Sequence, residues 1–179
     1  MSSKPGGLAS FALLAAAGVA LVFVLGRGIE KRRDAGWQDV AERLHGSFRS
    51  APACSELDRF GSPAPWAQWA SDGELRCLRT IDGNDDGAWA LVQVRYSVRE
   101  RRGEEHPDTW YEVTVAAVRR ASATAPRALV AAAAPDGHLA LQNGTSVFLW
   151  KKGSPGAGAS LDAGEMPALL EEARRLATR

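Results

Sequence analysis

Apolar residues run almost without interruption near the N-terminus and alternate with polar residues farther along the chain. Residues 8–25 read LASFALLAAAGVALVFVL and contain no charge. About 18 helical residues are roughly 27 Å long, close to the thickness of the bilayer hydrocarbon. The run has no polar face at helical spacing, and Ala15–Ala17 lie in its middle rather than at a cleavage position after it. We therefore expect a transmembrane helix over 8–26, preceded by a short tail over 1–7.

Basic residues flank the C-terminal side of this apolar run. The juxtamembrane segment 27–36 carries Arg27, Lys31, Arg32 and Arg33. Only Lys4 and the terminal amine are positive on the other side. Because positively charged flanks stay in the cytoplasm, this bias predicts a single-pass protein of the plasma (inner) membrane with its C-terminal domain in the cytoplasm. The lipid bilayer is then a partner, and anionic headgroups would attract the basic segment.

Two amphipathic helices are expected at the two ends of the remaining chain. One set of apolar residues at helical spacing predicts the first: Trp37, Val40, Ala41 and Leu44. We expect Gly36 to interrupt any continuation of this helix toward the membrane and Gly46 to stop it. The closing stretch MPALLEEARRLA predicts a second helix over 166–177. Residues 47–73 are rich in proline, glycine and serine and predict mostly loop, with one helical turn at Trp66 and Trp69 packing on the core.

Alternating apolar and polar residues predict an antiparallel sheet between these helices. The expected strands are 73–81, 88–98, 109–118, 138–150 and 127–134, although the alanines of the last also suit a helix. In the second of these strands, one face is apolar and the other carries Gln93, Arg95 and Ser97. Asn143-Gly144 predicts a type I′ hairpin. Helices packed on one face of such a meander give an α+β domain over 37–179.

Composition narrows the possible partners. The 179 residues are 45% hydrophobic and 24% charged, as in globular domains, and the formal net charge is only +1. Glutamates interleave with six arginines along the predicted long hairpin, so we expect an ion-paired surface and no nucleic-acid partner. The six are Arg95, Arg99, Arg101, Arg102, Arg119 and Arg120. Cys54 and Cys77 would form one bridge in an exported domain and remain thiols in a cytosolic one. The charge bias of the flanks favours thiols.

The stretch IDGNDDGAW at 81–89 has the opening spacing of a calcium loop. Its candidate oxygen ligands are Asp82, Asn84 and Asp86, and glycine follows as that loop requires. The twelfth position, however, is Gln93, which cannot supply the bidentate carboxylate. Asn, Asp and Gly are also the residues that tight turns select. We therefore expect a turn between two strands here, with at most a weak cation site.

Other motifs for chemistry are incomplete. His45, His106 and His138 are far apart in the sequence and lack the spacing of zinc ligands. The glycine-rich segment 153–160 lacks the Lys-Ser/Thr ending of a phosphate-binding loop and predicts a connector. We expect no cofactor and identify no catalytic residue, although a catalytic site assembled in space would leave no such motif.

The chain resembles a group of uncharacterised bacterial single-pass membrane proteins. The resemblance rests on the anchor with its basic flank, on WQDVAERLHGSF, and on DGHLALQNGTSVFLWKKG followed by EMPALLEEARRLA. It implies an anchored domain but no activity. We expect a non-catalytic interaction or scaffold domain that meets another membrane or cytosolic protein. Two alternatives stay open: an extracytoplasmic binding domain with a Cys54–Cys77 bridge, and a membrane-anchored enzyme.

Overall fold

The computed structural model describes residues 6–69, 73–85, 88–98, 109–122, 128–153 and 160–179, without the side chains of residues 6–14, 16 and 98. Its contacts divide the chain into two compact units, residues 1–36 and 37–179. The helices are α1 (Gly6–Arg43), the 3-10 helix η1 (Cys54–Phe60), α2 (Pro65–Trp69) and α3 (Met166–Ala177). The strands are β1 (Ser47–Ser50), β2 (Leu75–Gly83), β3 (Trp89–Val98), β4 (Thr109–Arg119), β5 (Val130–Ala131), β6 (His138–Gln142) and β7 (Ser146–Lys151).

Helix α1 is continuous, so the interruption expected at Gly36 is wrong. A glycine costs a helix only about 1 kcal/mol relative to alanine, which a helix of 38 residues tolerates. The predicted stop is confirmed, because α1 ends at Arg43 and the amide of Gly46 donates to the Ala41 carbonyl at 2.8 Å. A Cβ at Gly46 would lie 2.8 Å from the Ile81 side chain, so glycine is required there by close packing.

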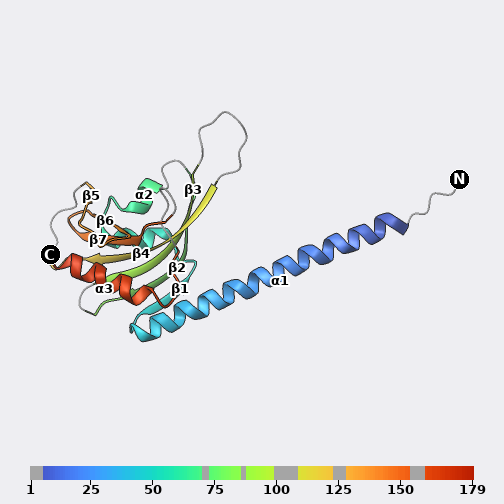
Figure 1. Ribbon diagram of the computed structural model, residues 1–179, viewed down its shortest axis with the longest axis horizontal. Coiled ribbons are helices and arrows are strands. Elements are labelled where there is room, and N and C mark those ends of the chain that lie inside the picture. Colours follow the sequence, from blue (N-terminus) through green and yellow to red (C-terminus); the bar gives the residue numbers. More distant parts are fainter. Residues whose placement is uncertain (1–5, 70–72, 86–87, 99–108, 123–127, 154–159) are drawn as a thin grey trace, which may run out of the picture. The chain divides into compact units, whose positions relative to one another are not determined.

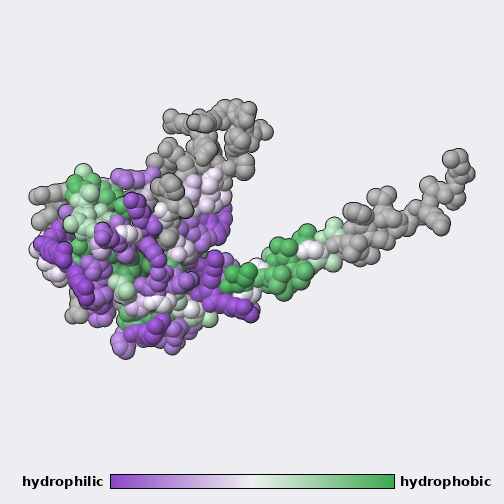
Figure 2. Space-filling model, viewed as in Figure 1, coloured by the Kyte–Doolittle hydropathy of each residue, from purple (hydrophilic) through white to green (hydrophobic). Residues whose placement is uncertain are grey.

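The N-terminal part of α1 is apolar on every described side chain between Val19 and Leu25, and these side chains are exposed. Figure 2 shows this part of the helix in green. Within the described part of the chain, no helix contains a stretch long and apolar enough to cross a membrane. The side chains of residues 8–14 and 16, which belong to the predicted span, lie outside that part.

The C-terminal unit is built on one antiparallel sheet, as predicted. Its described strands follow the order β1-β2-β3-β4-β7-β6-β5, and every neighbouring pair is antiparallel. The long hairpin of β3 and β4 pairs Trp89 with Val118 at one end and Val98 with Thr109 at the other. The charged segment 99–108, which joins these two strands, lies outside the described residues. The α+β class with an N-terminal helix, an antiparallel sheet and a C-terminal helix is therefore confirmed.

Both faces of the sheet are covered, whereas helices on one face were expected. Helix α3 lies across one face (Figure 1), where the end of α1 also packs. Helices η1 and α2 belong to the core on the opposite face. The alternation in β3 suggested one apolar face and one polar face. Trp89 and Leu91, however, lie on the face with the polar residues, and both are fully buried in the core that α3 and the end of α1 complete.

Helices η1 and α2, which we call the second cover of the sheet, come from the segment 47–73 that was expected to be mostly loop. Trp66 packs edge-on against Phe148 at a centroid distance of 5.2 Å, and Trp69 stacks on Tyr96 at the same distance, so the predicted helical turn at the core is confirmed. Strand β1 and helix η1 were missed. Both are short, and proline and serine surround them.

A disulfide joins Cys54 of η1 to Cys77 of β2, with a Cα–Cα distance of 5.4 Å. The expectation of two free thiols is therefore wrong. That expectation rested on the charge bias beside the apolar run, which contains no information about which side chains the fold brings together. The bridge closes a loop that contains both η1 and α2, so it ties the second cover to the sheet.

The hairpin of β6 and β7 is confirmed, but its turn is not type I′. The φ angle is +82° at Gly144, whereas Asn143 is not among the residues with positive φ. Asn143 is instead fully buried and uses its side chain as a cap. Its Oδ1 accepts the amides of Thr145 and Ser146 at 3.0 and 2.9 Å, and its Nδ2 donates to the carbonyls of Phe60 and Pro63 at 3.2 and 3.0 Å.

Candidate functional site

A cavity of about 740 Å³ lies where the β2–β3 connection, the end of β4 and the last turns of α3 meet. Its volume is within the range of sites for small molecules. The following residues line it: Asn84, Ala88, Val118, Arg119, Arg120, Ala121, Glu171, Arg174, Arg175, Ala177 and Thr178. Four arginines against one glutamate distinguish this lining from an ordinary surface hollow. We call it the arginine pocket.

Strand register brings these elements together. Trp89, the first residue of β3, pairs with Gly83 on one side and with Val118 on the other. The amide of Arg119 donates to the Ala88 carbonyl at 2.9 Å, which fixes the end of β4 beside the turn. A Cβ at Gly83 would lie 2.2 Å from the Trp89 ring, so glycine is needed for the indole to pack against this residue. The wall of the pocket is therefore set by backbone pairing.

One side chain of α3 is held in place by the β2–β3 turn. The Arg174 guanidinium lies over the Trp89 ring at 5.3 Å, and its Nη2 is 3.6 Å from Asp85 Oδ2. The Trp89 indole donates to Asp85 Oδ1 at 3.0 Å. This hydrogen bond, followed by the backbone hydrogen bond of Asp85 and the charges of Arg174 and His45, lowers the pKa of Asp85. Arg174 is thus oriented by a ring and a carboxylate before any ligand arrives.

The other arginines differ in how far their charge is already paired. Arg175 pairs with Glu171 and Glu172 at 3.6 and 3.4 Å. Arg120 Nη1 donates to Gln142 Oε1 at 2.8 Å, which leaves its charge without a carboxylate among the described residues. Arg119 is exposed and makes no side-chain hydrogen bond or ion pair within the same part of the chain. Positive charge therefore remains available at the end of β4.

Two guanidinium nitrogens are buried without a hydrogen-bond partner among the described residues. They are Arg120 Nε and Arg174 Nη2, the latter being too far from Asp85 for a hydrogen bond. An unsatisfied buried donor costs about 1–3 kcal/mol, more when it is charged. A ligand or water that accepts from these nitrogens would recover that energy. The arrangement therefore favours an occupant with hydrogen-bond acceptors.

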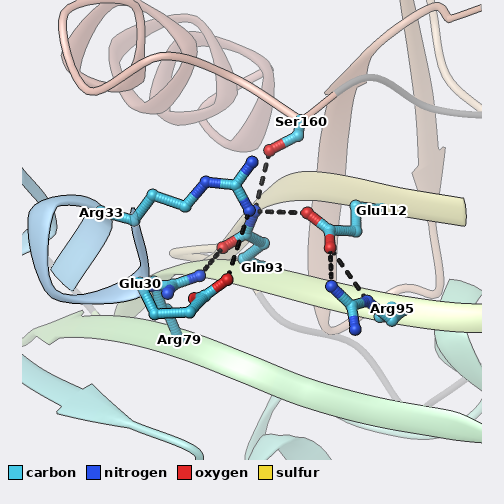
Figure 3. A network of polar contacts seen from close by, with 7 residues as sticks. All are labelled: Glu30, Arg33, Arg79, Gln93, Arg95, Glu112 and Ser160. Carbon is cyan, nitrogen blue, oxygen red and sulfur yellow. Dashed lines mark hydrogen bonds and ion pairs between the residues drawn. The ribbon is translucent and has the colours of Figure 1, made fainter. Parts of the chain in front are cut away.

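A second polar cluster has the opposite character, because its groups satisfy one another (Figure 3). Gln93 Oε1 accepts from Arg79 at 2.8 Å, and its Nε2 donates to the Ser160 hydroxyl at 2.8 Å and to Glu112 at 3.3 Å. Arg95 in turn pairs with Glu112. The Ser160 contact and the bond from the Leu161 amide to Thr114 at 3.1 Å fix the approach to α3 on the sheet. This cluster positions α3 and offers no unmatched charge for a ligand.

The structure describes two of the three candidate calcium ligands, Asp82 and Asn84. Asp82 faces two arginines, Arg49 at 2.5 Å and Arg59, and is therefore already paired. Asn84 lines the arginine pocket, and Asp86 lies outside the described residues. Among the described residues no three His, Cys, Asp or Glu side chains gather as metal ligands. The structure does confirm that the stretch joins two antiparallel strands, because Gly83 pairs with Trp89 across it.

The remaining candidates are the histidines, the glycine-rich segment and the basic residues of α1. His45 follows the end of α1 and has a φ of +52°. His138 Nδ1 is 3.2 Å from the Asp136 carbonyl, while His106 lies outside the described residues. Most of the glycine-rich segment 153–160 also lies outside them. The basic flanking residues are exposed on α1: Arg27, Lys31, Arg32 and Arg33. Of these, Arg27 lies over the Phe23 ring at 4.5 Å and Arg33 pairs with Glu30 at 3.6 Å.

Sequence reasoning did not find the arginine pocket. Arg119 and Arg120 were assigned to an ion-paired hairpin surface, and Arg174 and Arg175 could be explained by the helix dipole alone. The two pairs are more than fifty positions apart, so no spacing could join them. One signal was present: two consecutive arginines at the end of a strand, without a glutamate beside them.

Comparisons with models of protein families, with curated proteins and with solved structures found no match for this chain.

Proposed function

We propose that this chain is a membrane-anchored binding protein whose domain, residues 37–179, holds a small molecule in the arginine pocket. The single observation that carries the proposal is the pocket itself, a cavity of about 740 Å³ in which cationic side chains converge. Binding needs only complementary groups around a cavity of suitable size. Catalysis would also need a nucleophile or an acid–base pair in reach, and the described lining contains one carboxylate, Glu171, which is paired with Arg175.

The anchor is proposed from the sequence of residues 8–25. Leucine, valine and phenylalanine each favour insertion by roughly 0.3–0.6 kcal/mol at the centre of a bilayer, whereas one arginine opposes it by about 2.5–3.5 kcal/mol. In the full chain, Leu21→Arg combined with Val22→Arg should release the protein from membranes after an alkaline wash. Leu21→Ala with Val22→Ala is the matched control and should remain bound. Wild-type protein in the soluble fraction would contradict the anchor.

Two observations bear on the side of the membrane, and they oppose each other. The Cys54–Cys77 bridge favours an oxidising compartment, because the cytoplasm keeps thiols reduced. The basic residues after the apolar run favour a cytoplasmic domain. We place the domain outside the cytoplasm, because the bridge ties an entire cover to the sheet. A cytoplasmic interaction domain, meeting a cytosolic or membrane partner, is the second candidate, and the basic flank supports it.

A reporter fused after Arg179, together with thiol labelling in intact cells, tests the side. An extracytoplasmic domain should activate a periplasmic reporter in bacterial cells, and its two cysteines should resist alkylation until a reductant is added. A Cys54→Ser, Cys77→Ser chain provides the zero level for labelling. A reporter active in the cytoplasm, with both thiols labelled at once, would favour the second candidate instead.

A further inference from the structure

The arginine pocket also indicates the chemistry of its ligand. We propose that it binds a small organic molecule with at least two oxyanion groups, either phosphates or carboxylates. This inference rests on the proposed function only in taking the pocket as the binding site. It does not depend on the anchor or on the side of the membrane.

The described basic residues of the pocket are four arginines, which come as two pairs from two elements. Arg119 and Arg120 approach from the end of β4, and Arg174 and Arg175 approach from the last turns of α3. Arginine presents a planar fork that matches phosphate and carboxylate oxygens in pairs, which a lysine ammonium does not. Lysine is absent from the described part of the lining. Two pairs of guanidinium groups from separate elements suit two oxyanion groups on one ligand.

The existing partners do not account for this charge. The helix dipole explains basic residues in the last turn of α3 but not those at the end of a strand. Glu171 pairs with Arg175, and Asp85 lies 3.6 Å from Arg174. Arg119 has no side-chain partner among the described residues, and Arg120 Nε is buried without an acceptor there. The unmatched charge is therefore concentrated at Arg119 and Arg120.

The volume of the pocket and its neutral side chains indicate what else the ligand contains. A cavity of about 740 Å³ is far larger than a single inorganic anion needs, so the ligand has an organic body. Small apolar side chains share the lining with the arginines, namely Ala88, Val118, Ala121 and Ala177. Asn84 and Thr178 add neutral hydrogen-bonding groups. A compact polar molecule with anionic groups fits such a lining better than an apolar one.

Calorimetric titration of the full chain in neutral detergent tests the inference. The probes are citrate and phosphoglycolate, which carry two or more oxyanion groups, with inorganic phosphate and glucose as single-anion and neutral controls. Citrate or phosphoglycolate should bind at least about 10-fold more tightly than phosphate, and glucose should not bind. Arg119→Gln and Arg120→Gln should each weaken binding about 10-fold, and Arg120→Lys should weaken it less.

A matched control separates the pocket from general surface charge. Arg76→Gln removes the same charge from the other end of β2, where Arg76 pairs with Glu74 at 2.7 Å, and it should leave the affinity unchanged. Thermal unfolding of each variant confirms that the fold is intact. Equal loss with Arg76→Gln, no loss with Arg119→Gln and Arg120→Gln, or probes no better than phosphate would overturn the inference.

The outcomes also separate this inference from the proposed function. Glucose binding that Ala121→Trp abolishes and Arg120→Gln leaves unchanged would keep the pocket as a ligand site and overturn the oxyanion chemistry. Conversely, oxyanion binding by a chain that does not associate with membranes would support this inference and contradict the anchor.

Discussion

The side chain of Asn143 joins two segments that are about 80 residues apart in the sequence. It donates to Phe60 and Pro63 in one segment and accepts from Thr145 and Ser146 in the other. Both the donor and the acceptor capacity of the amide are used, so a buried polar group is fully satisfied at this position. The residue was expected to serve the turn through its backbone, and its main role is instead a link between the two segments.

Asn143→Ala should therefore destabilise the domain by about 2–4 kcal/mol, because it leaves two carbonyls and two amides without partners in a buried place. Urea unfolding of the full chain measures the change. Asn84→Ala, an exposed asparagine in the β2–β3 connection, is the matched control and should change stability by less than about 0.5 kcal/mol. Similar unfolding midpoints for both variants would show that the link contributes little.

Asp85 makes stability depend on pH in the acid range. Its pKa is lowered, chiefly by the hydrogen bond from Trp89 and further by the charge of Arg174. A group whose pKa is depressed in the folded state stabilises the fold above its unfolded pKa of about 3.9, and that contribution disappears as the pH falls through the folded pKa. The free energy of unfolding should therefore fall less steeply with acidification in Asp85→Asn than in the wild type.

Unfolding measured from about pH 5 downward tests this dependence, since the unfolded pKa lies near 3.9. Trp89→Phe removes the indole donor while Asp85 stays, and it should also make the acid slope shallower than in the wild type. Parallel slopes for the wild type and Asp85→Asn would show that the contact with Trp89 does not persist in solution.

At the scale of elements, the β2–β3 connection shows why a motif can mislead. Its first acidic residue, Asp82, belongs to the end of β2 and faces Arg49 and Arg59. Asp85, which has no place in the calcium pattern, orients Arg174 instead. Gln93 lies within the strand and is used by Arg79 and Ser160. The acidic residues that suggest a cation-binding loop thus pair with arginines around a turn.

We expect no calcium affinity tighter than roughly millimolar in this segment, because no bidentate carboxylate is available at the twelfth position. Calorimetric titration of calcium into the full chain measures it. Asp82→Ala should instead lower stability, by about 1 kcal/mol, because Arg59 loses its carboxylate and Arg49 keeps only Glu56. Micromolar calcium binding that Asp82→Ala abolishes would contradict this interpretation.

Local patterns predicted most elements of the domain but not what covers them. Helix α3 occupies the predicted 166–177, and β3 and β4 lie close to their predicted bounds, because period and length identify such elements by themselves. Strand β1 has four residues and follows a helix end, so it exists only through pairing with β2. Helices were expected on one face of the sheet only, because the sequence of a single strand does not show which segments pack on its other face.

For the whole molecule, the site was less predictable than the fold. The arginine pocket needs the β2–β3 turn, the end of β4 and the end of α3 in one place, and only the sheet register provides that. The bridge is similar, because Cys54 and Cys77 meet only after η1 packs on the sheet. Features that depend on one segment could be predicted from the sequence, whereas those that bring two or three distant segments together required the structure.

Reduction of the Cys54–Cys77 bridge should lower the free energy of unfolding by about 3 kcal/mol, because it releases a closed loop of about two dozen residues in the unfolded chain. Urea unfolding with and without reductant gives this value. The Cys54→Ser, Cys77→Ser chain should match the reduced wild type and should not respond to reductant. A wild type that is equally stable in both conditions would show that the loop is held by packing alone.

The same bridge has a consequence for how the chain can be cut. Residues 54–77 form a covalent ring that contains all of η1 and α2. A single proteolytic nick inside this ring would leave the two fragments joined, so the protein would keep its full mass on a non-reducing gel and separate only after reduction. The cover over the second face would thus survive one cleavage as part of the molecule, which is a form of protection that its packing alone could not provide.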